Sequence, residues 1–142
     1  MPQMIFVNLP VADLEKAKSF YAAIGAVNEP KFTNAQAACM VLSDTIFVML
    51  LTHSFFQGFT EKKIADAHDT CQVLLCISRD SRADVDTITE QAISAGGRET
   101  RPVQDMGMMY SRSFEDPDGH VWEPMWMDPA AAEQGADAFE DA

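Results

Sequence analysis

The stretch FEDPDGHVWE, Phe114–Glu123, says most about how this sequence folds. Asp-Gly is typical of two-residue hairpin turns, because the central residues of such turns need positive φ. We therefore expect Asp118-Gly119 to join two strands, one near Met108–Phe114 and the other over Val121–Met127.

The elements that precede this hairpin occur in the same order twice. The first half predicts a strand over Met4–Leu9, a helix capped by Asp13 and ended near Gly25, and strands near residues 27–33, 37–42 and 45–52. The second half predicts a strand over Cys71–Ser78, a helix from Ser81 to Gly96-Gly97, and strands near residues 98–103, 108–114 and 121–127. The chain therefore reads as an α+β fold of two βαβββ repeats. Each helix covers one face of its own sheet, and the other face lines a cavity.

The length of 142 residues suits one domain, and the repeats set its boundaries. The domain spans residues 1–128, with the first repeat at about 1–58, a polar link at 59–70 and the second repeat at about 71–128. The Ala-rich segment 129–142 contains no Lys or Arg, and we expect it to be a flexible acidic tail.

Charge and composition narrow the possible partners. The formal net charge is −12, and nucleic-acid binding is disfavoured because phosphate contacts need clustered Lys and Arg. No apolar run reaches the roughly 18 residues of a membrane span, and the first residues lack the pattern of a signal peptide, so we expect a cytoplasmic protein. Three cysteines without metal-type spacing are expected to be buried, reduced thiols in strands: Cys39, Cys71 and Cys76.

Three stretches carry a resemblance to a known family: VNLPVADLEKAKSFYAAIGA at residues 7–26, AGG at 95–97, and above all DPDGHVWE at 116–123. Together they resemble the vicinal oxygen chelate superfamily of glyoxalases, bleomycin-resistance proteins, fosfomycin-modifying enzymes and extradiol dioxygenases, and in particular its glyoxalase-like branch. The resemblance covers roughly residues 4–127. It implies a glyoxalase-like open barrel, a small-molecule ligand and a homodimer. It implies no single reaction, since proteins of one fold differ in chemistry.

Metal-using members of this family hold their ion with His or Gln, Glu, His and Glu, on the first and last strands of each repeat. The resemblance carries these positions onto Phe6, Met49, Gln72 and Glu123, of which only Glu123 is a standard ligand. Divalent ions need several nitrogen or oxygen ligands at about 2.0–2.2 Å. We therefore expect no tightly bound cofactor, and at most a weak divalent metal held by Gln72 and Glu123. The histidines are expected to be solvated loop or turn residues: His53, His68 and His120.

Strand alternation extends this candidate site, because side chains two residues apart point to the same face. The expected cavity face is mostly apolar, and its substrate-binding residues are Phe6, Asn8, Phe47, Met49, Gln72, Leu74 and Met125. Trp122 and Trp126 belong to the opposite face, where we expect them to pack beneath helices or at a subunit interface. Alternatively, the Phe and Met side chains of the cavity face simply fill the cavity and leave no site.

Two functions stay open for this face. Glu123 is the candidate catalytic residue, a base toward a proton next to a carbonyl group. It would serve a glyoxalase-like (lactoylglutathione lyase-related) lyase or isomerase of a small carbonyl compound or thiol adduct, with Gln72 and Asn8 stabilising the oxygen. The alternative is a metal-free protein that sequesters a small hydrophobic or cationic molecule, as bleomycin-resistance proteins do. The alternative for Glu123 itself is a structural role, hydrogen-bonded to the backbone in the core.

Overall fold

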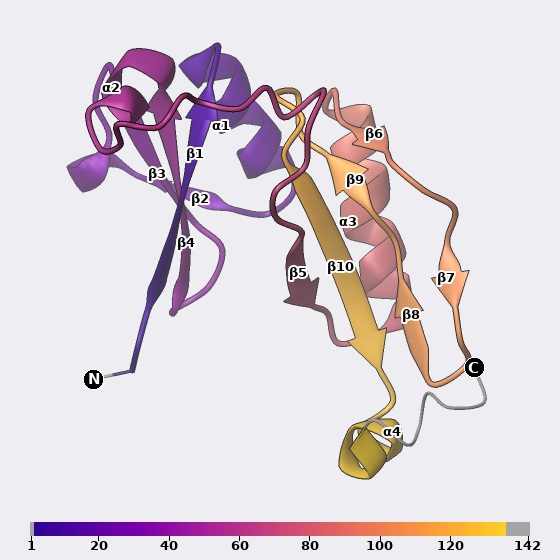
Figure 1. Ribbon diagram of the computed structural model, residues 1–142. Helices are drawn as coiled ribbons and strands as arrows, with labels where there is room; N and C mark the ends of the chain where they lie inside the picture. Colours follow the sequence, from indigo (N-terminus) through magenta and orange to yellow (C-terminus); the bar gives the residue numbers. More distant parts are fainter. Residues whose placement is uncertain (1, 136–142) are drawn as a thin grey trace.

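The computed structural model describes residues 2–135, and in it each predicted repeat forms a sheet of its own (Figure 1). The first sheet has the order β1-β4-β3-β2, with β1 and β4 parallel and the other pairs antiparallel. Its helix α1 (Leu14–Ala23) follows β1, and two short helical segments follow β2 and β4. The elements are β1 (Ile5–Val11), β2 (Val27–Glu29), η1 (Pro30–Phe32), β3 (Ala37–Val41), β4 (Ile46–Thr52) and α2 (His53–Gln57).

The second sheet repeats this topology. Its last strand β10 (Val121–Met127) pairs in parallel with the first strand of the repeat, β5 (Leu75–Ser78), as β4 pairs with β1. Helix α3 (Arg82–Ser94) follows β5, and the order of the remaining path is β6-β9-β10-β8-β7. The other elements are β6 (Arg98–Glu99), β7 (Gln104–Asp105), β8 (Met109–Ser111), β9 (Phe114–Glu115) and α4 (Pro129–Gln134). The predicted α+β architecture of two βαβββ repeats is therefore confirmed.

Both long helices begin and end where local chemistry predicts. The Asp13 carboxylate accepts a hydrogen bond from the backbone N–H of Lys16 at 3.0 Å, and the Ser81 hydroxyl accepts one from Asp84 at 3.1 Å. Such caps satisfy N–H groups that have no partner inside the helix. Gly25, which follows α1, has φ of 105°, a conformation that other residues rarely adopt.

One hydrophobic core joins the two repeats. α1 packs on the first sheet, α3 packs on the second, and the two helices also touch each other. The Phe20 ring of α1 lies 6.2 Å from the Phe114 ring of the second sheet, and both side chains are buried. The faces of the sheets that carry Leu9, Leu50 and Trp122 therefore point into this shared core. The opposite faces are left for a ligand or a partner.

The motif at residues 116–123 holds this arrangement together through a buried network. The Tyr21 hydroxyl donates to Asp116 Oδ2 at 2.5 Å and accepts from Trp122 Nε1 at 3.0 Å. Asp116 Oδ1 accepts the backbone N–H groups of Asp118 and His120, each at 2.9 Å. The network thus ties the last hairpin of the second repeat to helix α1 of the first. The network also holds Trp122 beneath α1, on the face of β10 where it was predicted to lie.

A second polar cluster fixes α3 to its sheet. The Arg112 side chain is only 10 % exposed, and its guanidinium donates to Glu99, Glu90 and Asp86, each at between 2.9 and 3.2 Å. These three acids raise the pKa of Arg112 further above its ordinary value, Glu99 most strongly. A buried charge is tolerated when it is paired and hydrogen-bonded in this way.

The segment between the repeats, residues 59–70 and here called the linker, lies against the last hairpin. Gly119 has φ of 94°, and a Cβ atom there would come within 2.7 Å of the Ala67 carbonyl carbon and the His68 nitrogen. Only glycine allows this approach, because any larger residue would collide with the linker backbone. The last turn therefore also positions the linker. Its central residues are Pro117 and Asp118 and not the predicted Asp118-Gly119, because the Gly119 N–H donates to the Asp116 carbonyl.

Three expectations need correction. The strand predicted from Cys71 begins at Leu75, because only from that residue onward does β10 lie alongside to accept its hydrogen bonds. Cys39 is buried in β3, but Cys71 and Cys76 are exposed. The predicted flexible tail begins with a helix, α4, and its last residues lie outside the described range.

No helix within residues 2–135 has the length and apolar character needed to cross a bilayer.

Candidate ligand-binding site

The predicted site residues of the first repeat come together on one face of the sheet. Phe6 pairs with Phe47 and Asn8 with Met49 across parallel strands β1 and β4, so all four lie opposite the face covered by α1. The Phe6 ring stacks on the Phe47 ring with centroids 4.7 Å apart and planes inclined by 13°. Phe6 is nevertheless 49 % exposed. This largely apolar face is therefore exposed at Phe6 and Asn8 and half-buried at Phe47 and Met49.

The corresponding face of the second repeat carries the predicted carboxylate, but Glu123 does not stand alone. Arg101 Nη2 donates to Glu123 Oε2 at 3.1 Å and to the Ser111 hydroxyl at 3.3 Å. Met125 pairs with Ser111, so it shares this face. The candidate base Glu123 is therefore part of an ion pair, with one of its carboxylate oxygens engaged. The sequence held no sign of it, since the two residues lie 22 positions apart.

Cys76, which the sequence predicted only as a buried thiol, also lies on this face. It is the register partner of Glu123 in the parallel pair β5–β10, so both side chains point the same way. Partial burial raises the pKa of the Cys76 thiol, and the Glu123 charge raises it further, while Arg101 lowers it. Because the thiolate is the reactive form, Cys76 is a poor nucleophile here.

The two remaining predicted residues lie outside the sheets. Gln72 and Leu74 precede β5, and both are exposed. Gln72 lines a cavity under the linker, whereas Leu74 is 57 % exposed. Of the four positions matched to metal ligands, two are thus on the first sheet, one is on the second and one is on neither.

The residues at these positions do not fit a family-type divalent metal site. Phe6 has no donor atom, Met49 offers only a thioether, and Glu123 is already paired with Arg101. Within the described part of the chain, no three His, Cys, Asp or Glu side chains are grouped so that they could hold a metal ion. A weak metal through Gln72 and Glu123 stays a prediction that this geometry does not favour.

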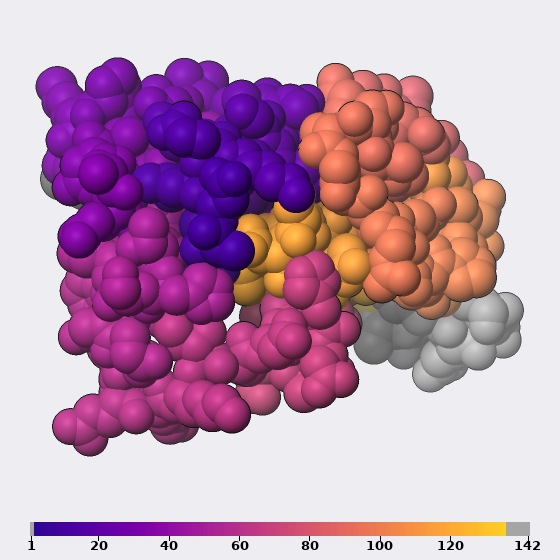
Figure 2. All heavy atoms as spheres, turned by 90° about the horizontal axis from the view of Figure 1, so that it is seen from above, coloured from indigo at the N-terminus to yellow at the C-terminus, as the bar shows by residue number. Residues whose placement is uncertain are grey.

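A cavity of about 370 Å³ lies where the linker crosses between the two repeats. Its walls combine apolar residues of both repeats with two lysines of the linker: Leu9, Phe56, Leu75, Val121, Lys62 and Lys63. In the view from above, the linker forms an outer rim, and a hollow separates it from the strands behind (Figure 2). We call this the linker cavity. It shares only Gln72 with the predicted site.

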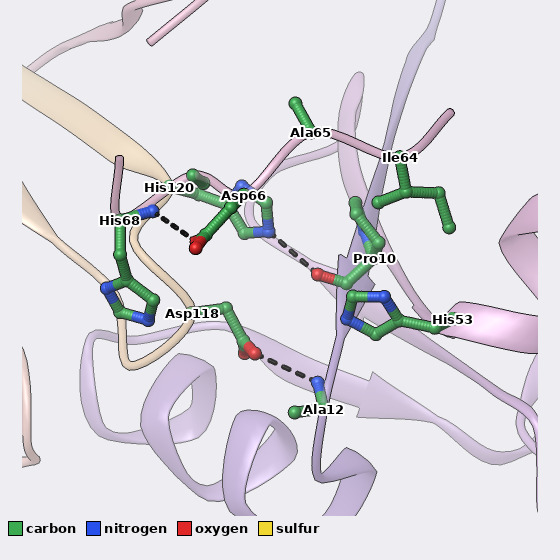
Figure 3. A pocket seen from close by; sticks show the side chains of 10 residues that line it. Pro10, Ala12, His53, Ile64, Ala65, Asp66, His68, Asp118 and His120 are labelled. Atoms are coloured by element: carbon green, nitrogen blue, oxygen red, sulfur yellow. Dashed lines mark hydrogen bonds between the residues drawn. The ribbon is translucent and has the colours of Figure 1, made fainter. Parts of the chain in front are cut away.

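A smaller cavity of about 250 Å³ gathers the three histidines on the other side of the linker (Figure 3). His120 bonds through Nε2 to the Pro10 carbonyl at 2.8 Å, and the Asp118 carboxylate accepts the Ala12 N–H at 2.9 Å. Asp66 accepts the backbone N–H of His68 at 3.0 Å. These polar groups mainly tie loops to β1 and to the linker turn, so His120 is a structural turn residue, as predicted.

Comparison with known proteins agrees with the fold. A hypothetical protein from S. aureus is 24 % identical, with a TM-score of 0.74 over 89 % of this chain and 94 % of that one. The fosfomycin resistance protein FosX from Mesorhizobium loti is 18 % identical, with a TM-score of 0.68 over 94 % and 98 %. A bleomycin resistance determinant encoded on transposon Tn5 is 19 % identical, with a TM-score of 0.62 over 89 % and 98 %. At these identities the likeness shows the fold alone.

The sequence itself also matches a family. No curated protein matches the chain. Residues 52–123, about half of its length, match the family described as Glyoxalase/Bleomycin resistance protein/Dioxygenase superfamily. This range runs from the end of β4 to Glu123 and so includes the linker, α3 and the closing motif. The chain therefore belongs to the glyoxalase/bleomycin resistance protein/dioxygenase superfamily.

Proposed function

We propose that this protein binds a small, largely hydrophobic molecule without a metal, in the manner of a bleomycin-resistance protein. The observation that carries the proposal is the stacked Phe6–Phe47 pair with Met49 on the same face, because Phe6 and Met49 stand at positions that the resemblance matches to metal ligands. Aromatic and Met side chains provide contact area that adapts to the shape of a ligand. Two fold neighbours, the fosfomycin and bleomycin resistance proteins, are named for resistance to a drug.

The second repeat supplies the polar part of the proposed site. Binding sites are usually apolar, with a few placed polar groups that orient the ligand. Arg101 and Glu123 are held together on the ligand face, and their side chains are 25 % and 20 % exposed. Their ion pair presents a donor and an acceptor side by side, so a ligand with a hydroxyl or amide group can be oriented there.

The same surfaces support a homodimer, which we include in the proposal. β1 is an edge strand of its sheet, and Ile5 and Phe6 on it are 57 % and 49 % exposed. Val73 and Leu74, just before β5, are 58 % and 57 % exposed. Apolar residues that are exposed along strand edges are typical of surfaces that a second chain covers. A second copy would close the open faces into a cavity.

Light scattering coupled to size-exclusion chromatography tests the dimer. The wild type should elute with the mass of two chains, and Leu74→Asp with the mass of one. Ile93→Asp places the same charge on an exposed apolar residue of α3, away from the proposed interface, and should remain dimeric. A wild-type mass of one chain at tens of micromolar would contradict the dimer.

A glyoxalase-like lyase or isomerase is the second candidate, and Glu123 favours it. Its carboxylate lies on the ligand face at the position of a family ligand, and only Oε2 is bonded to Arg101. The other oxygen has no hydrogen bond within residues 2–135, so it is free to accept a proton from a substrate. Within residues 2–135, no group of side chains offers this enzyme a donor set for the family's metal.

One experiment separates the two functions. Protein purified without chelator is analysed for metal and assayed on the methylglyoxal–glutathione adduct with and without added Zn²⁺ or Ni²⁺. Binding of Nile red, a neutral apolar dye, is measured before and after EDTA. We expect less than one metal ion per chain, no turnover, and dye binding that EDTA leaves unchanged.

Variants locate the proposed site. Phe6→Ala should weaken dye binding about tenfold, because it removes an aromatic face from the ligand surface. Phe59→Ala, at an equally aromatic and more exposed position next to α2, should leave binding within twofold of wild type. A stoichiometric metal ion, together with turnover that Glu123→Gln abolishes, would replace the binding function by the lyase.

A further inference from the structure

We propose that the linker cavity is a separate binding site for a compact amphipathic anion, an aromatic or short aliphatic molecule that carries one carboxylate or sulfonate group. This goes beyond the proposed function, because none of the ligand-face residues Phe6, Phe47, Met49 and Glu123 lines the cavity.

The size and walls of the cavity suit the apolar part of such a molecule. Its volume is about 370 Å³, within the range of roughly 300–1,000 Å³ that is usual for small-molecule sites. Leu9 and Phe56 come from the first repeat, and Leu75 and Val121 from the second. A ring or short alkyl chain placed between them would bury apolar surface from both repeats, which favours binding.

The charge around the cavity selects the polar part of the ligand. Lys62 and Lys63 line it, and no Asp or Glu among residues 2–135 does, although the chain holds 22 acids and a net charge of −12. Neither lysine takes part in an ion pair among the described residues. Asp66, from the same linker, lines the histidine cavity instead. The two lysines therefore make this cavity attractive to an anion, although the protein as a whole has a negative net charge.

Hydrogen bonds order the loop that carries the two lysines. Gln57 Nε2, at the end of α2, donates to the carbonyl oxygens of Thr60 and Lys62 at 2.9 and 2.8 Å. The Lys62 N–H donates to the Thr60 hydroxyl at 3.1 Å. Farther along, the Gly119 turn packs against the linker backbone. A cavity whose rim is already ordered loses little conformational freedom when a ligand enters.

Three naphthyl compounds that differ only in their polar group test the charge preference. Isothermal titration calorimetry of the full chain at low salt uses 1-naphthylacetate, its neutral amide 1-naphthylacetamide, and the cation 1-naphthylmethylammonium. The anion should bind best and the cation worst. The proposal is overturned if the amide binds as tightly as the acetate, or if neither binds at millimolar concentration.

Paired lysine variants locate the anion. Lys62→Gln combined with Lys63→Gln should weaken binding of the acetate about tenfold, the size expected for two exposed ion pairs, and leave the amide within twofold. Lys16→Gln combined with Lys31→Gln makes the same change in net charge on α1 and η1, away from the cavity, and should leave acetate binding within twofold. Equal losses in the two double variants would show an effect of net charge alone, and would overturn the site.

A further variant tests the cavity itself. Ala65→Trp fills the space from the exposed linker side and should abolish binding of both acetate and amide. Nile red binding to the sheet faces should survive in this variant and in the lysine variants, whereas Phe6→Ala should leave acetate binding unchanged. Loss of acetate binding in Phe6→Ala, with wild-type affinity in Ala65→Trp, would move the anion to the sheet faces and overturn the proposal. Failure of the linker site and failure of the proposed function are thus distinguishable.

Discussion

Replacing Tyr21 by Phe removes one oxygen atom from the centre of the buried network that joins the repeats. Trp122 Nε1 then loses its acceptor, and Asp116 Oδ2 loses its donor. Tyr21, Asp116 and Trp122 are at most 2 % exposed, so water cannot replace the lost partners without rearrangement. The hydrogen bond from Trp122 is between neutral groups, whereas the one to Asp116 is made to a carboxyl group and is stronger. Because both are lost, we expect the free energy of unfolding to fall by about 2–4 kcal/mol.

The assay is urea unfolding at neutral pH, followed by tryptophan fluorescence. The midpoint should fall while the slope stays unchanged, and the melting temperature should drop by roughly 10 °C. Tyr110→Phe makes the same change where the hydroxyl donates to Asp86 at 2.6 Å, but Asp86 is 47 % exposed and keeps its bond to Arg112. It should cost less than about 1 kcal/mol. Equal losses for the two variants would refute the role of the buried network.

The pH dependence of the Tyr21→Phe loss gives an independent check. Burial raises the pKa of Asp116 above its ordinary value, while His120 and the hydrogen bond from Tyr21 lower it. A carboxyl whose pKa is raised by folding destabilises the fold as the pH rises through that pKa. Removing Tyr21 raises the pKa of Asp116 further, so the loss should be largest at neutral pH and shrink as Asp116 becomes protonated. A loss that grows on acidification would contradict this assignment.

Three further predictions concern single side chains. Gly119→Ala should cost about 2 kcal/mol and speed hydrogen exchange in the linker, whereas Gly25→Ala, with similar φ but no atom within 4 Å, should cost about 1 kcal/mol and leave the linker protected. Arg112→Met should cost about 2 kcal/mol in urea unfolding, because three carboxylates lose their shared donor. The Arg82 guanidinium, which is hydrogen-bonded to the Asp105 carboxylate, holds the pKa of Asp105 at about 2. The ionised Asp105 should therefore stabilise the fold above pH 4, and this contribution should be lost toward pH 2. Asp105→Asn should remove this part of the acid unfolding transition.

Local signals were enough to predict the fold. The caps at Asp13 and Ser81 involve residues close together in the sequence, and both are found where expected. The last hairpin turn lies near its predicted place, but its central residues are Pro117 and Asp118, and Gly119 follows them with positive φ. The repeated order of elements then determined the topology, since each helix needs a sheet to cover. Side-chain alternation also assigned the faces of β1 and β10 correctly, with Phe6 outward and Trp122 inward.

The site was harder to predict, because its contacts join residues far apart in the chain. Arg101 meets Glu123 only after two strands have paired beside β10, and spacing alone does not specify that register. Gln72 was assigned to a strand by its apolar neighbours, but no strand of the described chain pairs with it. The linker cavity depends on where a polar segment without strands crosses the molecule, which no periodic pattern reports.

The closing motif shows why the fold of this chain could be predicted more fully from the sequence than its chemistry. Asp116 and Trp122 face the core and bond to Tyr21, and Asp118 and His120 bond to the backbone of the first repeat. Val121 and Glu123 point to the opposite face, because they lie on either side of Trp122 along the strand. Most of the motif therefore serves the joining of the repeats. A chain can keep it intact while Phe and Met replace the metal ligands elsewhere, so the motif is evidence for the superfamily and not for its metal chemistry.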